Sequence, residues 1–264
     1  MSLVAFTIAG CIYLWAVHTC AKTGPYNDAH LDTSGPDIDK KQPVSIPRQL
    51  CNFREKITAD EKNIIITIFD EAVKVFRSYN ISYHLQYGTL IGAYRHGGIM
   101  PWDTDIDISV DVSDRPFIEK IFIDLAKSSA QQKICYLNHG NFLSRIYSAF
   151  KHGPNSPDEC FDRWPRVDIF YHSINDDGIN YLCDSIVCPP TRLNVTRIFP
   201  LKMIQFESRL HPAPRDIEYV IEATYKRDVT RQCCNFKSQC YVDESLESVC
   251  VDCSDLRPYY KFVK

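Results

Sequence analysis

The sequence predicts an α+β fold, in which helices flank a mixed β-sheet and a cysteine-rich C-terminal tail follows. Three observations support this class. A helical apolar repeat follows a capping sequence at residues 58–61, a strictly alternating run occupies residues 105–110, and further strand-like runs precede a last helical segment. The 264 residues and the 45% hydrophobic content are sufficient for one folded domain with an N-terminal extension.

The first residues have the composition of a targeting segment. Residues 2–17 are apolar and uncharged, and Lys22 is the first basic side chain. A spanning helix needs about 20 apolar residues and a signal-peptide core about 7 to 15, so this run is read as a signal peptide or a signal anchor. The predicted partition is this leader at 1–21, a polar stem at 22–50, a domain at 51–232 and a cysteine-rich tail at 233–264.

Cysteines and two glycosylation sequons indicate the secretory pathway. Ten cysteines lie beyond the leader, an even number that an oxidising lumen would pair. Asn80 and Asn194 each begin an Asn-X-Ser/Thr sequon. We therefore expect the Golgi or endoplasmic reticulum lumen, with the chain secreted or held in the membrane by an uncleaved leader. In the tail, Cys250 and Cys253 form a CxxC pair, which leaves disulfides and a zinc site open, with disulfides favoured.

The first structured elements are predicted from local signals. Thr58 and Glu61 form a capping box, and a helix follows with apolar residues at helical spacing. Residues 83–87 alternate like a strand and lead to a turn at Gly88 and Thr89, after which a short helix is expected at residues 90–95. The apolar positions of the first helix are Ile64, Ile65, Ile68, Ala72, Val75 and Phe76.

The second half of the chain adds strands and two helices. Residues 105–110 alternate strictly, so this strand has one polar and one apolar face. Asp114 is the expected cap of a helix whose buried side would carry Phe117, Ile121, Leu125 and Ala126. From residue 233 onward the tail is expected to be irregular. The remaining predicted elements are strands at 134–137, 142–150, 167–172 and 180–187 and a helix at 215–225.

The aspartates of the alternating strand carry the predicted chemistry. Asp105 and Asp107 project from the same face, close enough to share a divalent cation, and Mg²⁺ or Mn²⁺ accepts such oxygen ligands. Asp168 interrupts a later apolar strand, where an unpaired carboxylate would be costly, and is the expected third carboxylate. Asp103 is expected to be structural. The net charge of −3 supplies no broad positive field, so a nucleic-acid polymer is not an expected partner.

The longest motif resembles a known family. Residues 87–108 read YGTLIGAYRHGGIMPWDTDIDI, which resembles the signature of the LicD/fukutin family, including bacterial phosphocholine transferases and ribitol-phosphate transferases. Residues 167–170, VDIF, resemble the family's second acidic motif. Residues 199–201 and 225–228 resemble its C-terminal elements more loosely. Thr104 stands where many members carry an acid, so any role of that side chain is absent here.

The resemblance implies a nucleotidyltransferase-like fold and an enzyme, a phosphotransferase for substituted phosphate groups. It would pass ribitol-, glycerol- or choline-phosphate from a CDP-activated donor to a glycan on a glycoprotein or glycolipid. Asp105, Asp107 and Asp168 would be the catalytic metal ligands, with Asp168 also as a general base. Gly88 and Thr89 would let the backbone approach the donor phosphates.

Two alternatives stay open at this point. Arg95 lies beside the glycines of the motif and either holds a donor phosphate through its guanidinium or forms a surface ion pair. The alternative function, from a different class, is a non-catalytic glycan-binding protein, secreted or anchored in a membrane, that retains the fold.

Overall fold

The computed structural model describes most of the chain after its N-terminal segment. The chain divides into two units, Met1–Gln42 and Pro43–Lys264, and all described residues belong to the second. The predicted leader and most of the predicted stem lie outside them. No helix in the described part is both long and apolar enough to cross a membrane. The described residues are 46–128, 134–139, 143–148, 165–176, 178–182, 191–226, 228, 231–235 and 249–264.

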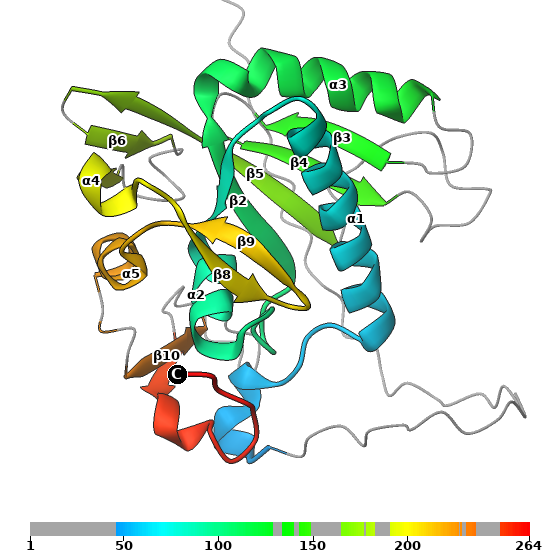
Figure 1. The fold of residues 1–264 in the computed structure, drawn as a ribbon. Coiled ribbons are helices and arrows are strands. Elements are labelled where there is room, and N and C mark those ends of the chain that lie inside the picture. Colours follow the sequence, from blue (N-terminus) through cyan, green and yellow to red (C-terminus); the bar gives the residue numbers. More distant parts are fainter. Residues whose placement is uncertain are drawn as a thin grey trace, which may run out of the picture. The chain divides into compact units, whose positions relative to one another are not determined.

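A seven-stranded mixed sheet organises the second unit (Figure 1). Its main path runs β1-β2-β5-β4-β3, and β6, paired with the second half of β5, leads on to β7. Among the described strands of this sheet, β2 and β5 are parallel and the other pairs are antiparallel. The predicted α+β class with a mixed sheet is therefore confirmed. The strands are β1 (Tyr83–Leu85), β2 (Asp105–Asp111), β3 (Ile134–His139), β4 (Leu143–Ser148), β5 (Arg166–Asn175), β6 (Gly178–Tyr181) and β7 (Thr191–Leu193).

Helix α1 (Ala59–Ser78) packs against the sheet at β2, β4 and β5. Its predicted capping box is confirmed, because Thr58 Oγ1 accepts from the Glu61 amide and the Glu61 carboxylate accepts from the Thr58 amide. Such a cap contributes about 1 kcal/mol, whereas each large apolar side chain buried contributes about 1.5–3 kcal/mol, so the apolar face dominates. That face consists of Ile65, Ile68, Phe69, Ala72, Val73 and Phe76.

Helix α3 (Arg115–Ser128) packs beside β3, and the buried face that the sequence predicts is correct in part, since Ile121 is buried and Leu125 packs against the core. Phe117, expected to be buried, is 43% exposed, and its ring lies 5.1 Å from that of Tyr79. Ile118 and Phe122, which the sequence analysis did not name, are buried beside Ile121. The helix starts directly after the 3₁₀ turn η2 (Val112–Asp114), which sets its rotation so that positions i, i+3 and i+4 from residue 118 face the sheet.

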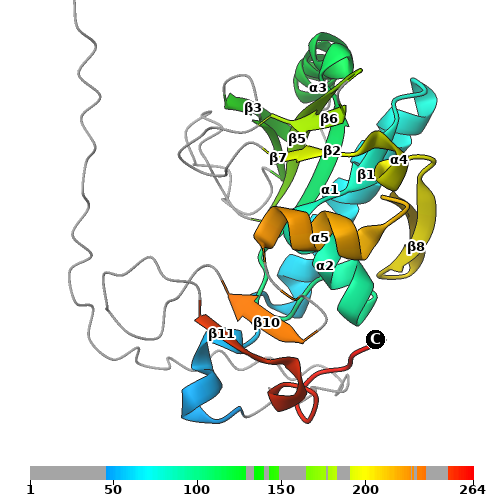
Figure 2. The same ribbon diagram turned by 90° about the vertical axis from the view of Figure 1, so that its left-hand side faces the viewer.

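Helices α2 (Tyr87–His96) and α5 (Ile217–Tyr225) lie side by side (Figures 1 and 2). The Tyr94 hydroxyl of α2 donates to the Glu218 carboxylate of α5. Helix α2 begins three residues earlier than predicted. It ends at Gly97, whose φ of 70° is the left-handed conformation that glycine adopts without strain.

Two β-hairpins accompany the main sheet. The first, β8 (Lys202–Phe206) with β9 (Arg209–Ala213), was not predicted and packs beside β1. The second, β10 (Gln232–Asn235) with β11 (Val249–Asp252), lies in the tail, where the expectation of irregular structure is wrong for these residues. A single short helix, α4 (Val195–Ile198), lies between β7 and β8.

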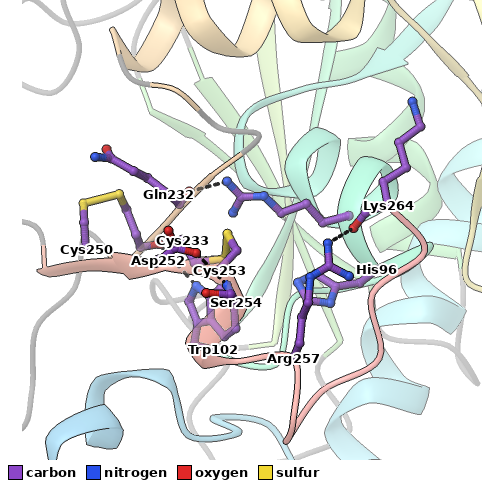
Figure 3. Close-up of a disulfide and its surroundings, with 12 residues drawn as sticks. His96, Trp102, Gln232, Cys233, Cys250, Asp252, Cys253, Ser254, Arg257 and Lys264 are labelled. Atoms are coloured by element: carbon purple, nitrogen blue, oxygen red, sulfur yellow. Dashed lines mark hydrogen bonds between the residues drawn. A yellow bond between two sulfur atoms is a disulfide. The ribbon is translucent and has the colours of Figure 1, made fainter.

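The tail hairpin is cross-linked by two disulfides (Figure 3). Cys233 bonds to Cys253, and Cys234 bonds to Cys250. The CxxC cysteines are therefore paired with the vicinal pair rather than arranged as zinc ligands. Cys51 is also disulfide-bonded.

The tail and residues 46–53 pack on the rest of the domain. The Tyr260 hydroxyl donates to the carbonyl of Phe53 (2.8 Å), and the Trp102 indole N–H donates to the carbonyl of Cys234 (3.3 Å). Ile46 and Leu50, which the sequence places in the polar stem, are buried in the core. Leu50 belongs to the 3₁₀ helix η1 (Arg48–Phe53). Residues on both sides of the predicted domain boundaries thus contribute to one packed unit.

Candidate active site

The predicted acids gather on one face of the two parallel strands. Alternation in β2 sends Ile106 into the core and places Asp105 and Asp107 on the opposite face. The β2–β5 register sets Asp107 directly across from Asp168. The residues Asp105, Asp107 and Asp168 are only 6%, 8% and 3% exposed. The strand pairing therefore brings together the three carboxylates that the sequence singles out.

Two arginines that the sequence analysis did not single out neutralise part of this charge. Arg166 is paired with Asp105 in the register, and its Nη2 donates to Asp105 Oδ2 at 2.7 Å. Its Nε lies 3.1 and 3.3 Å from the two oxygens of Asp168. Arg145 on β4 is paired with Asp168, and its Nε donates to Asp168 Oδ1 at 3.1 Å. Arg166 therefore bridges two of the three predicted metal ligands.

Gly88 at the start of α2 lies against the carboxylates. A Cβ at this position would stand 2.4 Å from Asp103 Oδ2 and 3.5 Å from Asp107 Oδ2. Only a residue without a side chain therefore leaves this space open. Asp103, expected to be structural, contributes its carboxylate here. Thr89 does not point away from the acids either, because its Oγ1 accepts from the Asp107 amide at 2.7 Å and fixes the backbone there.

The donor atoms suit a hard divalent cation. All of the predicted ligands are carboxylate oxygens, the ligand type that Mg²⁺ and Mn²⁺ prefer. Within the described part of the chain, no three His, Cys, Asp or Glu side chains are grouped closely enough to hold a metal as they stand. The Arg166 guanidinium instead contacts the carboxylates of both Asp105 and Asp168.

Burial shifts the pKa of the third carboxyl. Desolvation raises the pKa of Asp168, while the nearby Arg166 and Arg145 lower it in part. A raised pKa brings a carboxyl closer to the range in which a general base works near neutral pH.

Two tyrosines complete the surroundings of the acids. Burial raises the pKa of Tyr225, at the end of α5, well above its ordinary value, and the neighbouring charges of Asp107 and Asp103 raise it further. Tyr87, at the start of α2, has a pKa raised to about 12 by burial and by Asp107. Both phenols are therefore neutral near pH 7 beside the carboxylates. The sequence placed Tyr225 in a loosely matching family element but not beside the acids, because this position depends on how α5 packs.

Arg95 is engaged at the other end of α2. It lies seven residues after Gly88, about 10 Å along a helix. Its buried guanidinium donates to the carbonyl of Gln232, and burial lowers the pKa of Arg95 to about 10. The backbone carbonyl of Arg95 also accepts from the Val263 amide at 2.6 Å. Arg95 thus attaches the tail to α2 and is buried, so the surface position considered above is wrong.

Beyond the acids, the same sheet face carries a buried neutral cluster. Ser109 Oγ lies 2.8 Å from His172 Nδ1, and His84 Nε2 lies 2.9 Å from the Tyr181 hydroxyl. The two imidazole rings are 5.3 Å apart. Burial lowers the pKa of His172 to about 4 and that of His84 well below its ordinary value, so both are neutral near pH 7.

Just over half of the chain matches a known protein family. Residues 80–216, which contain the site, match a nucleotidyltransferase domain. The match includes Gly88, Thr89 and all four aspartates of the site. The full description of the matching family is LicD/FKTN/FKRP, nucleotidyltransferase domain. Because the match covers just over half of the chain, the chain belongs to this family, as the resemblance implied.

Individual relatives match over shorter segments. The lipopolysaccharide cholinephosphotransferase LicD of Haemophilus influenzae is 46% identical over 55 residues, which cover 20% of this chain and 21% of that protein. The human ribitol 5-phosphate transferase FKRP is 43% identical over 42 residues, covering 16% of this chain and 8% of that protein. An uncharacterized protein of Rickettsia typhi is 28% identical over 123 residues, covering 46% and 39%. The matches thus span less than half the length of each of these relatives.

One solved structure is similar over a larger share of the chain. It is the lincosamide antibiotic adenylyltransferase LnuA with lincomycin bound, at a TM-score of 0.36 and 14% sequence identity, covering 60% of this chain and 80% of that one. A likeness of this size carries no functional argument, so the family assignment depends on the sequence match.

Proposed function

We propose that this chain is a metal-dependent transferase that passes a phospho-alcohol group from a CDP-activated donor to a glycan in the secretory pathway. The observation that carries the proposal is the carboxylate arrangement, in which Asp107 stands across from Asp168 with Asp105 on the same face. This arrangement lies inside the segment that matches the family. The names of LicD and FKRP give choline and ribitol as candidate alcohols, and glycerol is the third.

Each residue of the site has a proposed role. Asp105, Asp107 and Asp168 would hold Mg²⁺ or Mn²⁺, and a bound cation supplies positive charge to the oxygens of the transferred phosphate. Asp168 would also accept the proton of the acceptor hydroxyl. Gly88 leaves room for the donor phosphates, and Thr89 keeps the Asp107 backbone in place.

Structural features support the proposed compartment. Both sequon asparagines, Asn80 and Asn194, are exposed. The Asn194 side chain accepts from the Thr196 amide (2.9 Å) and hydroxyl (2.8 Å), so the two side chains that define this sequon face each other at the surface. Disulfides in the tail also favour an oxidising lumen. The leader at residues 1–21 stays a prediction.

The proposal is tested by a transfer assay with CDP-ribitol, CDP-glycerol and CDP-choline in the presence of Mg²⁺ or Mn²⁺. We expect one donor to be consumed by the wild-type chain and none by Asp105→Asn. Asp111→Asn is the matched control, because Asp111 ends the same strand and asparagine can still accept from the Ser113 amide that Asp111 caps. Undiminished turnover in Asp105→Asn would exclude the proposed site.

One observation favours the non-catalytic alternative. Arg166 and Arg145 already offset the charge of Asp105 and Asp168, so the fold is held together without a cation. A glycan-binding protein that retained the fold would need no cation at this position. Calorimetry separates the two candidates, since the transferase should bind CDP in a cation-dependent manner that Asp105→Asn removes.

A further inference from the structure

We propose that Arg166 is a built-in counter-cation, which competes with the divalent cation for Asp105 and Asp168. This inference depends on the cation-binding part of the proposed function but not on the transfer reaction. It starts from the bridge described above, in which one guanidinium reaches both carboxylates at 2.7–3.3 Å.

The charge balance of the site gives the bridge its role. Asp105 and Asp168 are almost fully buried on adjacent strands, and two like charges so close together are destabilising without a positive partner. Arg166 supplies that partner from the same face of the sheet. The domain can therefore fold, and persist, before any cation arrives.

The same geometry makes the two cations compete. The Arg166 N–H groups are directed at Asp105 Oδ2 and at both oxygens of Asp168. A divalent cation bound by both carboxylates would stand close to the guanidinium, and because like charges repel, binding of the cation favours movement of Arg166 away from these oxygens.

Displacement is sterically feasible because of where Arg166 lies. It is the first residue of β5, and its side chain is 18% exposed, more than the carboxylates that it bridges. A long side chain at the start of a strand can rotate toward solvent without disturbing the ladder. Arg145 lies within β4 and pairs with Asp168, so it can retain part of the charge balance during the exchange.

The test measures cation binding directly, without donor. Mn²⁺ and Mg²⁺ are titrated by calorimetry into the wild type, Arg166→Gln, Arg166→Lys and the control Arg209→Gln, which removes a surface ion pair with Asp70. We expect Arg166→Gln to bind Mn²⁺ about tenfold more tightly, because a positive charge beside the ligands is lost. Arg166→Lys and Arg209→Gln should stay near the wild-type affinity.

Thermal unfolding provides the second readout. Without cation, Arg166→Gln should unfold at a lower temperature than the wild type, and saturating Mn²⁺ should raise its unfolding temperature by more than it raises that of the wild type. Circular dichroism at 20–25 °C, about room temperature, establishes that the variant is folded.

Several outcomes would overturn the inference. These are equal or weaker Mn²⁺ binding in folded Arg166→Gln, tighter binding in Arg209→Gln as well, or no cation binding in any variant. The proposed function fails separately. The wild type could bind Mn²⁺, and Arg166→Gln could bind it more tightly as expected, while the wild type consumes no CDP-alcohol. In that case the counter-cation inference would stand and the transferase function would be excluded.

Discussion

The polar face of β2 and β5 has two ends, and the buried polar side chains are paired differently at each end. At one end, Arg166 forms ion pairs with both Asp105 and Asp168. At the other end, Ser109 and His172 share a hydrogen bond between neutral groups. Both ends are shielded from water. The difference is that the neutral end is satisfied by hydrogen bonds between uncharged groups, whereas the acidic end depends on the long side chain of Arg166, with which, in our proposal, a cation competes.

The pKa shifts follow the same division. Burial disfavours charge at both ends, lowering the pKa of His84 and His172 and raising that of Asp168. Only at the acidic end do arginines oppose the effect of burial. We therefore interpret the acidic end as the functional one and the histidine end as structural, and four predictions examine this comparison.

The largest effect is expected from Asp168→Asn. This change removes the proposed base and third ligand while keeping the size of the side chain, so turnover should fall about a thousandfold. The transfer assay measures it, with Asp111→Asn as the control. A loss below tenfold would mean that Asp168 belongs with the structural end.

The pH dependence of stability tests the histidine end. Because the folded-state pKa of both histidines lies below the ordinary 6.5, the unfolded chain takes up protons first as the pH falls. Their stabilising contribution is thus complete above pH 6.5 and is lost as the pH falls toward about 4, the pKa of His172. Each histidine should contribute about 1.4 kcal/mol per pH unit to the slope. Urea unfolding at several pH values measures this slope. We expect a smaller slope in His172→Gln than in the wild type. An equal slope in the two proteins would mean that the imidazole ring is hydrated in the folded state.

The variant Thr89→Ala tests the contact between the start of α2 and the acidic strand. The Asp107 amide would lose its partner, and a buried donor without an acceptor costs about 1–3 kcal/mol. We expect lower stability together with a higher cation dissociation constant, because Asp107 is no longer held in place. Thr89→Ser keeps the hydroxyl and should restore both quantities in unfolding and calorimetry experiments.

The smallest effect is expected from Ser109→Ala. It removes the hydroxyl bonded to His172 and should lower the free energy of unfolding by about 1 kcal/mol. Turnover and Mn²⁺ affinity should not change, because Ser109 lies at the neutral end. A clear loss of cation affinity in this variant would contradict the proposed division of the face.

Local signals in the sequence predicted much of the scaffold. The capping box at Thr58 located the start of α1, and strict alternation located β2 together with the common face of Asp105 and Asp107. Hairpin β8–β9 was missed for identifiable reasons. Its turn places Glu207 at a φ of 52°, where glycine or asparagine is the usual signal, and Pro212 argues against a strand.

The arginines show where sequence reasoning reached its limit. Arg166 and Asp168 are two residues apart on one strand, so the alternation that placed the acids could also have placed this arginine. Arg145 had no such signal, because its position across from Asp168 depends on the β4–β5 register, a property of the assembled sheet. Arg95 was assigned from its place beside the glycines, which does not reveal which way a helical side chain points.

The double cross-link of the tail hairpin has a consequence for proteolysis. Cys233 and Cys234 lie on β10, and their partners Cys250 and Cys253 lie after the segment that follows β10 in the chain. A protease that cuts once between residues 235 and 249 therefore leaves two fragments joined by covalent bonds. Such a nicked chain would migrate as a single species on a non-reducing gel and separate only after reduction. The C-terminal residues that contact α2 would stay attached to the domain after the cut.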